Sequence, residues 1–152
     1  MASDKEFIQV VDRAFEATNR FMYYGSEIRP TVVWARAPTE FIAEWQVARE
    51  HIINGHIDEG VVATVTDNVT AMLIIGMAPA RKSVSTAISV QGVSAIKQPT
   101  AVEIHCKVSN KGTRQPHATA VFRDKADPSV VYAVGTHTKF FKAGLVESQP
   151  RL

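Results

Sequence analysis

The sequence has little cysteine and no dense run of positive charge. Cys106 is the only cysteine among 152 residues, so no intrachain disulfide is possible and we expect a reducing compartment. The 17 Lys and Arg residues are scattered among 15 Asp and Glu residues, which leaves a formal net charge of only +2. This pattern is not the basic patch that nucleic-acid binding requires, so we expect no nucleic-acid partner.

Signals for secretion and for membrane insertion are also missing. The opening Met-Ala-Ser-Asp-Lys-Glu-Phe carries acids where a signal peptide would carry basic residues followed by an apolar core. The most apolar stretch, residues 71–80, is about half as long as a membrane span. We therefore expect a soluble protein without a membrane partner. The expected compartment is the cytoplasm, with the mitochondrial matrix as the alternative.

Several motifs of large enzyme classes are absent. There is no phosphate-binding loop, no dinucleotide fingerprint and no G-x-S-x-G elbow. The histidines do not have the spacing of a metal site, and no cysteine lies near enough to complete one. They are His51, His56, His105, His117 and His137. We expect neither a metal nor a cofactor.

The chain instead shows the periodicity of a globular α+β protein, with 45% apolar and 21% charged residues. Ser3 is a candidate cap for a first helix, within residues 1–25, whose apolar stripe has helical spacing and which Gly25 would end. A second helix, from Asp58 to about Met77, is apolar on nearly every side, which indicates burial. The remaining apolar runs have the length and turn chemistry of strands. They cover residues 31–35, 41–47, 83–93, 101–109, 117–123 and 130–141.

This order of elements predicts one domain over residues 1–152, with a curved antiparallel sheet wrapped around the buried helix. The polar residues 142–152 are predicted to form a loose tail.

Asp67 is the most informative residue, because an acid within an apolar helix is costly unless it is paired, solvated or protonated. Its neighbours one turn away, Ala63, Thr70 and Ala71, are small, which would let a ligand or a partner chain approach. Two interpretations remain open. Asp67 is either a functional acid or a core acid bonded to a backbone amide or an arginine.

Three stretches make the sequence resemble the hot-dog-fold acyl-CoA thioesterases, of the phenylacetyl-CoA thioesterase and thioesterase-superfamily-member-2 type. Residues 60–68 combine a glycine, small and apolar residues, and Asp67-Asn68. Residues 84–97 match the family's next strand and turn, and residues 135–139 read Gly-Thr-His-Thr-Lys like its closing strand. The resemblance covers residues 44–141 and implies the hot-dog fold.

The resemblance also implies a homodimer, with a tetramer as an extension, whose two sites lie at the subunit interface. The buried helix of one subunit would polarise the thioester carbonyl through the amides of Glu59 and Gly60. On the other subunit, Asp67 would attack or activate water and Ser85 would position it. Coenzyme A enters only as part of the substrate. Its expected binding residues are Gly92, Val93, Ser94, Ala95, Ile96, Lys97, Asn110, Lys111, Gly112, Thr113 and Arg114, among which Lys97, Lys111 and Arg114 would face the phosphates.

The helix start departs from the family. Where the family has His-Gly-Gly, this chain has Asp58-Glu59-Gly60, and its upstream loop is one residue shorter, so that Asn54 takes the place of the family's site asparagine. Two carboxylates would stand where an anionic intermediate forms. These carboxylates would weaken the stabilisation of the intermediate, or the pKa of one of them would rise until that acid can donate a proton.

Three functions follow from these features. The first is hydrolysis of an acyl-CoA or acyl-carrier thioester. The second is a dehydration, isomerisation or cyclisation of a polyketide-like or other acyl intermediate by Asp58, Glu59 and Asp67. The third is a non-catalytic acyl-binding dimer.

Overall fold

The computed structural model describes residues 3–19 and 28–146, with side chains except at residues 17–19 and 143–146. Two long helices and six long strands dominate the fold, and a 3-10 turn and a small hairpin precede the second helix. In chain order the elements are α1 (Asp4–Asn19), β1 (Thr31–Arg36), β2 (Glu40–Val47), the 3-10 turn (Arg49–His51), β3 (Ile52–Ile53), β4 (His56–Ile57), α2 (Glu59–Met77), β5 (Arg81–Gly92), β6 (Thr100–Asn110), β7 (His117–Asp124) and β8 (Val131–Val146).

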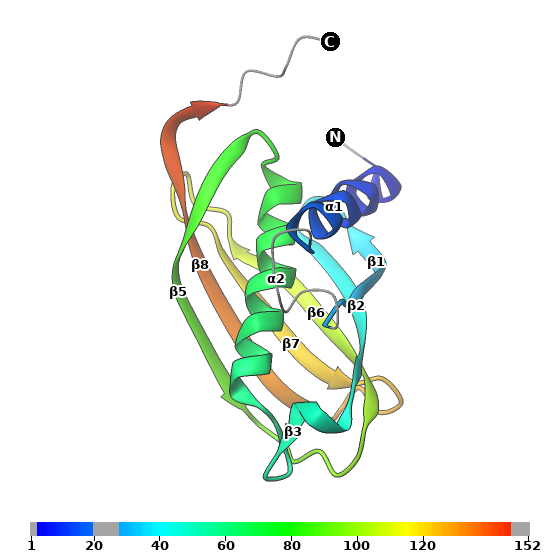
Figure 1. The fold of residues 1–152 in the computed structure, drawn as a ribbon. Coiled ribbons are helices and arrows are strands. Elements are labelled where there is room, and N and C mark those ends of the chain that lie inside the picture. Colours follow the sequence, from blue (N-terminus) through cyan, green and yellow to red (C-terminus); the bar gives the residue numbers. More distant parts are fainter. Residues whose placement is uncertain (1–2, 20–27, 147–152) are drawn as a thin grey trace.

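The sheet is antiparallel and curves around α2, as Figure 1 shows. Its strand order is β1-β2-β6-β7-β8-β5. Buried and more exposed residues alternate along β2, β6 and β7, so one face of the sheet packs on the core. The expected α+β architecture, with a curved sheet around a buried helix, is confirmed.

α2 begins and remains helical for reasons visible in its sequence. The Asp58 side chain accepts a hydrogen bond from the Val61 amide at 3.0 Å, which satisfies one of the unpaired N–H groups of the first turn. From Val62 to Ile74 most side chains are buried against the concave sheet. By length and composition α2 would also pass for a membrane span, but here it is the core helix of the sheet.

α1 lies across the C-terminal end of α2 (Figure 1). Ser3 caps it, since the Glu6 amide donates to Ser3 Oγ while Glu6 Oε2 accepts from the Ser3 amide at 2.7 Å. The stripe of Phe7, Val11 and Phe15 is buried, as predicted. A side chain at Gly76 would meet the Phe7 ring at 2.6 Å, so this glycine permits the close packing of the helices.

Some boundaries differ from those predicted. β8 continues to Val146, beyond the predicted end at residue 141, because Arg81 of β5 still pairs with Val146 across an irregular register. Local periodicity cannot reveal such a partner. Residues 142–146 of the predicted loose tail, 142–152, therefore belong to β8 instead. The rest of that tail and the predicted end of the first helix at Gly25 lie outside the described residues.

β5 forms one edge of the sheet, beside β8 (Figure 1). Most of its residues are exposed, including Val84 and Ile88 at 39% and 40%. A long edge strand with exposed apolar residues is a template for pairing with another chain.

Candidate active site

Asp67 and Ser85 lie together where the middle of α2 faces the edge strand β5. Ser85 Oγ is 3.3 Å from Asp67 Oδ1, and 35% of the Asp67 side chain is exposed. The pairing of β5 with β8 shifts register between Ser85 and Ala87. Such irregularities often redirect a side chain next to a functional site. The structure thus brings together the two residues that the resemblance paired.

His137 and Lys139 of β8 complete this cluster. His137 Nε2 lies 2.9 Å from Ser85 Oγ and 3.4 Å from Asp67 Oδ1. Lys139 Nζ donates to Ser85 Oγ at 3.1 Å. Neither residue was predicted to be a site residue. Their two-residue spacing places them on one face of β8, which was the available signal.

Thr70 fixes the proton on His137. The Thr70 hydroxyl donates its only hydrogen to the carbonyl oxygen of Thr66 at 2.6 Å. Because that hydrogen is committed, Thr70 Oγ1 accepts from His137 Nδ1, also at 2.6 Å. In a neutral imidazole this leaves Nε2 as an acceptor, so the one proton of the Ser85 hydroxyl has two acceptors within reach: His137 Nε2 at 2.9 Å and Asp67 Oδ1 at 3.3 Å.

Burial supports the neutral form of His137. The removal of the ring from water, together with the nearby Lys139 ammonium, lowers the pKa of His137 to about 4, although Asp67 opposes this shift. Burial also lowers the pKa of Lys139, and Asp67 again acts in the opposite direction. At neutral pH, His137 is therefore uncharged.

This arrangement suits the activation of a water molecule. When the Ser85 proton is directed to the nearer acceptor, His137 Nε2, Ser85 Oγ accepts from Lys139 and keeps a second lone pair free as an acceptor. Asp67 offers a carboxylate 3.3 Å away. A water molecule that donates to both oxygens would direct its own lone pair outward, which is the geometry of general-base catalysis.

Gly135 allows β8 to approach α2 beneath this cluster. A side chain at Gly135 would overlap the hydroxyl of Thr66, one helical position before Asp67. Thr66 is fully buried, and its Oγ1 has no hydrogen-bond partner. The glycine at the start of the Gly-Thr-His-Thr-Lys stretch is therefore needed for packing.

The small-residue face around Asp67 is open only at Ala63, which is partly exposed. Thr70 and Ala71 are buried in the core, and Thr70 is occupied by His137. The interpretation of Asp67 as a core acid bonded to an amide or an arginine is wrong. Its recorded partners are Ser85 and His137.

The helix N-terminus lies far from this cluster in the same chain. Asp67 follows Glu59 by eight positions, which corresponds to about 12 Å along a helix. Asp58 is occupied by capping Val61, whereas Glu59 and Gly60 are exposed and no acceptor for their amides is recorded in the described part of the chain. A single chain thus does not bring Asp58, Glu59 and Asp67 together as one acid–base set.

Asn54 occupies the tip of the β3–β4 hairpin. Its φ of 50° and the φ of 77° at Gly55 are the left-handed values that such a tight turn requires. Asn54 is exposed and has no recorded contact with Asp67 or Ser85. Its position is explained by the turn.

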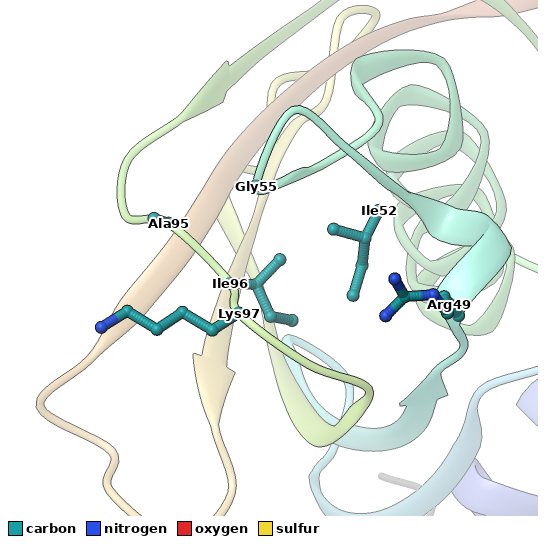
Figure 2. A pocket seen from close by; sticks show the side chains of 6 residues that line it. All are labelled: Arg49, Ile52, Gly55, Ala95, Ile96 and Lys97. Carbon is teal, nitrogen blue, oxygen red and sulfur yellow. The ribbon is translucent and has the colours of Figure 1, made fainter.

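The turn after β5 lines a cavity of about 440 Å³ together with the β3–β4 hairpin. In Figure 2, Arg49 points toward Ile52 and Ile96, whereas the Lys97 side chain extends away. Gly55 and Ala95 complete the lining. Ala95, Ile96 and Lys97, three of the predicted binding residues, therefore line one pocket, and Arg49 is a cation that the sequence did not suggest.

The other predicted binding residues lie at two further places. Gly92 ends β5, and the amides of Val93 and Ser94 donate to the Tyr132 carbonyl at 2.8 and 3.4 Å. A separate cavity of about 380 Å³ is lined by Asn110, Gly112, Thr113, Arg114, Gln115 and Phe140, and Lys111 is exposed in the same loop. The predicted binding residues of the turn after β5 and those of the β6–β7 loop thus line different pockets of one chain.

Cys106 is buried in the core, and burial raises the pKa of its thiol well above the usual value. Within residues 3–19 and 28–146, no group of three or more His, Cys, Asp or Glu side chains is placed to hold a metal ion.

No protein-family model and no curated protein matches the sequence. Solved structures do match it. Zebrafish thioesterase superfamily member 2 is 24% identical with a TM-score of 0.75, over 89% of this chain and 98% of that one. The Escherichia coli PaaI protein of the phenylacetic acid degradation operon is 8% identical with a TM-score of 0.72, over 91% of this chain and 98% of that one. A Streptococcus mutans protein bound to acetyl CoA is 15% identical with a TM-score of 0.65, over 75% and 89%.

These similarities establish that the chain has the hot-dog fold. Over most of its length the chain matches hot-dog thioesterase structures, so the resemblance read from its residues is confirmed at the level of structure.

Proposed function

We propose that the protein hydrolyses an acyl thioester, with Asp67 as general base and Ser85 as the group that orients the attacking water. The observation that carries this proposal is the cluster of Asp67, Ser85 and His137, in which a partly exposed carboxylate lies 3.3 Å from a hydroxyl whose nearer acceptor is His137 Nε2 at 2.9 Å. The thioesterase structures that share the fold support this choice of reaction.

The proposed site needs two chains. The amides of Glu59 and Gly60 are available to polarise a carbonyl, but about 12 Å of helix separates them from Asp67 of the same chain. For the reaction, the water molecule held by Asp67 must contact the thioester carbonyl that these amides polarise. The helix N-terminus that serves one Asp67 must therefore come from a second copy.

The exposed edge of β5 supports a homodimer of this kind. Ser85 lies on that strand, and Val84 and Ile88 beside it are exposed apolar residues that a second copy would cover. Pairing along β5 would bring a second chain to the site.

The proposed substrate carrier is coenzyme A or an acyl carrier. The similar Streptococcus mutans structure is bound to acetyl CoA. In this chain, Arg49 beside the turn after β5, and Arg114 in the β6–β7 loop, offer guanidinium groups that suit phosphate oxygens.

The test is a thiol-release assay over short, long and aromatic acyl-CoAs, with Ser85→Ala measured beside the parent. We expect thiol release by the parent with at least one acyl group, and a large loss of kcat in the variant. If the parent released no thiol from any member of the panel, the protein would be a non-catalytic binder or would carry out another reaction on the fold.

A further inference from the structure

A basic pocket of about 400 Å³ lies beside the proposed reaction centre, at the C-terminal end of α2. Four of its seven lining residues are basic, and no Asp or Glu of the described chain lines it. The lining consists of Ile75, Pro79, Arg81, Lys82, Ser83, Lys139 and Lys142. Among them Arg81, Lys139 and Lys142 bring like charges around one cavity, and an anion bound there would relieve their repulsion.

Arg81 is held in place for binding. Its guanidinium carbon lies 3.9 Å from the centre of the Phe141 ring, and that ring is itself buried. Stacking on the ring fixes the plane of the guanidinium and leaves the N–H groups at its edge available as donors. This geometry suits the paired oxygens of a carboxylate or a phosphate.

Lys139 supplies an independent indication of a ligand. Its side chain is only 7% exposed, and its one recorded hydrogen bond goes to Ser85. An ammonium has three donors, so two remain without a recorded acceptor in a buried place. Buried donors without acceptors are costly, and an anion in the pocket would satisfy them.

The pocket is continuous with the reaction centre, because Lys139 belongs to both. Ser83 of the lining lies two residues from Ser85 on β5, and Ile75 lies eight residues beyond Asp67 on α2. These spacings place the pocket within about 12 Å of the reacting oxygen atoms. Ile75 and Pro79 add an apolar wall that suits a short aliphatic chain.

We propose that this basic pocket binds an anionic group of the substrate, so that the preferred substrate is a thioester carrying a carboxylate or phosphate within reach of Arg81 and Lys139. This inference rests on the proposed thioester substrate. The anion has two sources with the same chemistry: a carboxylate at the end of the acyl group, or the phosphates of coenzyme A.

The experiment measures binding of thioethers, which the protein cannot hydrolyse. The probes are S-carboxypropyl-CoA, its neutral match S-butyl-CoA, and S-carboxypropyl-pantetheine, which has no phosphate. Each is titrated calorimetrically into the parent, Arg81→Gln and Lys142→Gln. Lys5→Gln removes an equal charge from α1, outside this pocket, as a control.

We expect both pocket variants to weaken binding about tenfold, as loss of a charge-assisted hydrogen bond does, and the control to bind like the parent. A loss confined to the two carboxylate probes assigns the pocket to the acyl group. A loss confined to the two CoA probes assigns it to the phosphates.

The proposal would be overturned if the parent and both variants bound the probes with equal affinity. It would also be overturned if the variants lost the same affinity for all three probes, or if the parent bound none of them. Failure of the proposed hydrolysis would look different. The parent would then bind the probes but release no thiol in the acyl-CoA assay.

Discussion

Thr70 Oγ1 and His137 Nδ1 are joined by a buried hydrogen bond of 2.6 Å that links the core of α2 to the candidate site. Since Thr70 donates to Thr66, this bond determines which ring nitrogen of His137 faces Ser85. The orientation of the Ser85 hydroxyl therefore depends on a threonine that does not touch the substrate side of the cluster.

Replacement of Thr70 by valine tests this relationship. The shape is kept, but His137 Nδ1 loses its partner, so we expect the free energy of unfolding to fall by about 1 to 3 kcal/mol. We also expect kcat for thiol release to fall more than KM changes. Denaturant unfolding and steady-state kinetics measure the two effects.

Thr64→Val is the matched control. The Thr64 hydroxyl also donates to a carbonyl one turn earlier, Gly60 at 2.8 Å, but it does so on the exposed side of α2. An effect of Thr64→Val as large as that of Thr70→Val would show that the loss comes from the helix and not from His137.

Asp67→Asn should lower kcat for thiol release by about 100-fold or more, because an amide cannot take a proton from water. The stability of the variant, measured by thermal unfolding, should stay near that of the parent. Glu44→Gln, which removes a surface acid paired with Lys125, controls for the loss of charge. Unchanged kinetics in Asp67→Asn would refute the general-base role.

The low pKa of His137 predicts an acid-sensitive fold. The pKa is about 4 in the folded protein and 6.5 ordinarily, so the unfolded chain binds more protons between these values. The contribution of His137 to stability is complete above about pH 6.5 and is lost as the pH falls toward 4. The loss is on the order of 2 to 3 kcal/mol.

Equilibrium unfolding of the parent and of His137→Gln across this pH range measures that contribution. Other acids titrate in both proteins, so the difference between the two curves reports on His137. Parallel curves would mean that His137 titrates normally in the folded state.

Gly135→Ala should destabilise the protein by about 1 to 3 kcal/mol, because the new methyl group would overlap Thr66. Adding Thr66→Ala should recover part of the loss, since it removes the overlapping hydroxyl. Gly92→Ala is the control in the same sheet, where the nearest atom to a new side chain is 3.8 Å away. Chemical denaturation of these three variants and of Thr66→Ala alone measures the coupling, and additive effects of the two substitutions would contradict the predicted overlap.

Ile88→Lys should weaken the proposed homodimer, because it places a charge on the exposed edge strand β5. Sedimentation velocity over a range of concentrations measures the shift toward monomer. Val33→Lys on β1 is the matched control at the opposite edge of the sheet, where Val33 is 46% exposed. If the two variants behaved alike, β5 would not be the dimer edge.

Much of the fold was predictable from local sequence. The apolar run after Asp58 predicts α2 almost to the residue, because length and all-round apolarity distinguish a buried helix from a strand. The six long strands were found by their turns and β-branched residues. Asp67 could be singled out because an acid is conspicuous in an apolar helix, and the family resemblance paired it with Ser85.

Tertiary structure decided what surrounds Asp67. Thr70 and His137 are 67 positions apart, and they come into contact only because β8, paired with β5, packs against α2 in the folded chain. Arg81, Lys139 and Lys142 likewise converge on one pocket from two strands, although their charges look scattered in the sequence. Periodicity reports which face of an element is buried, because that is a local property of the chain. Which side chains meet there is set by long-range packing, which no local pattern encodes.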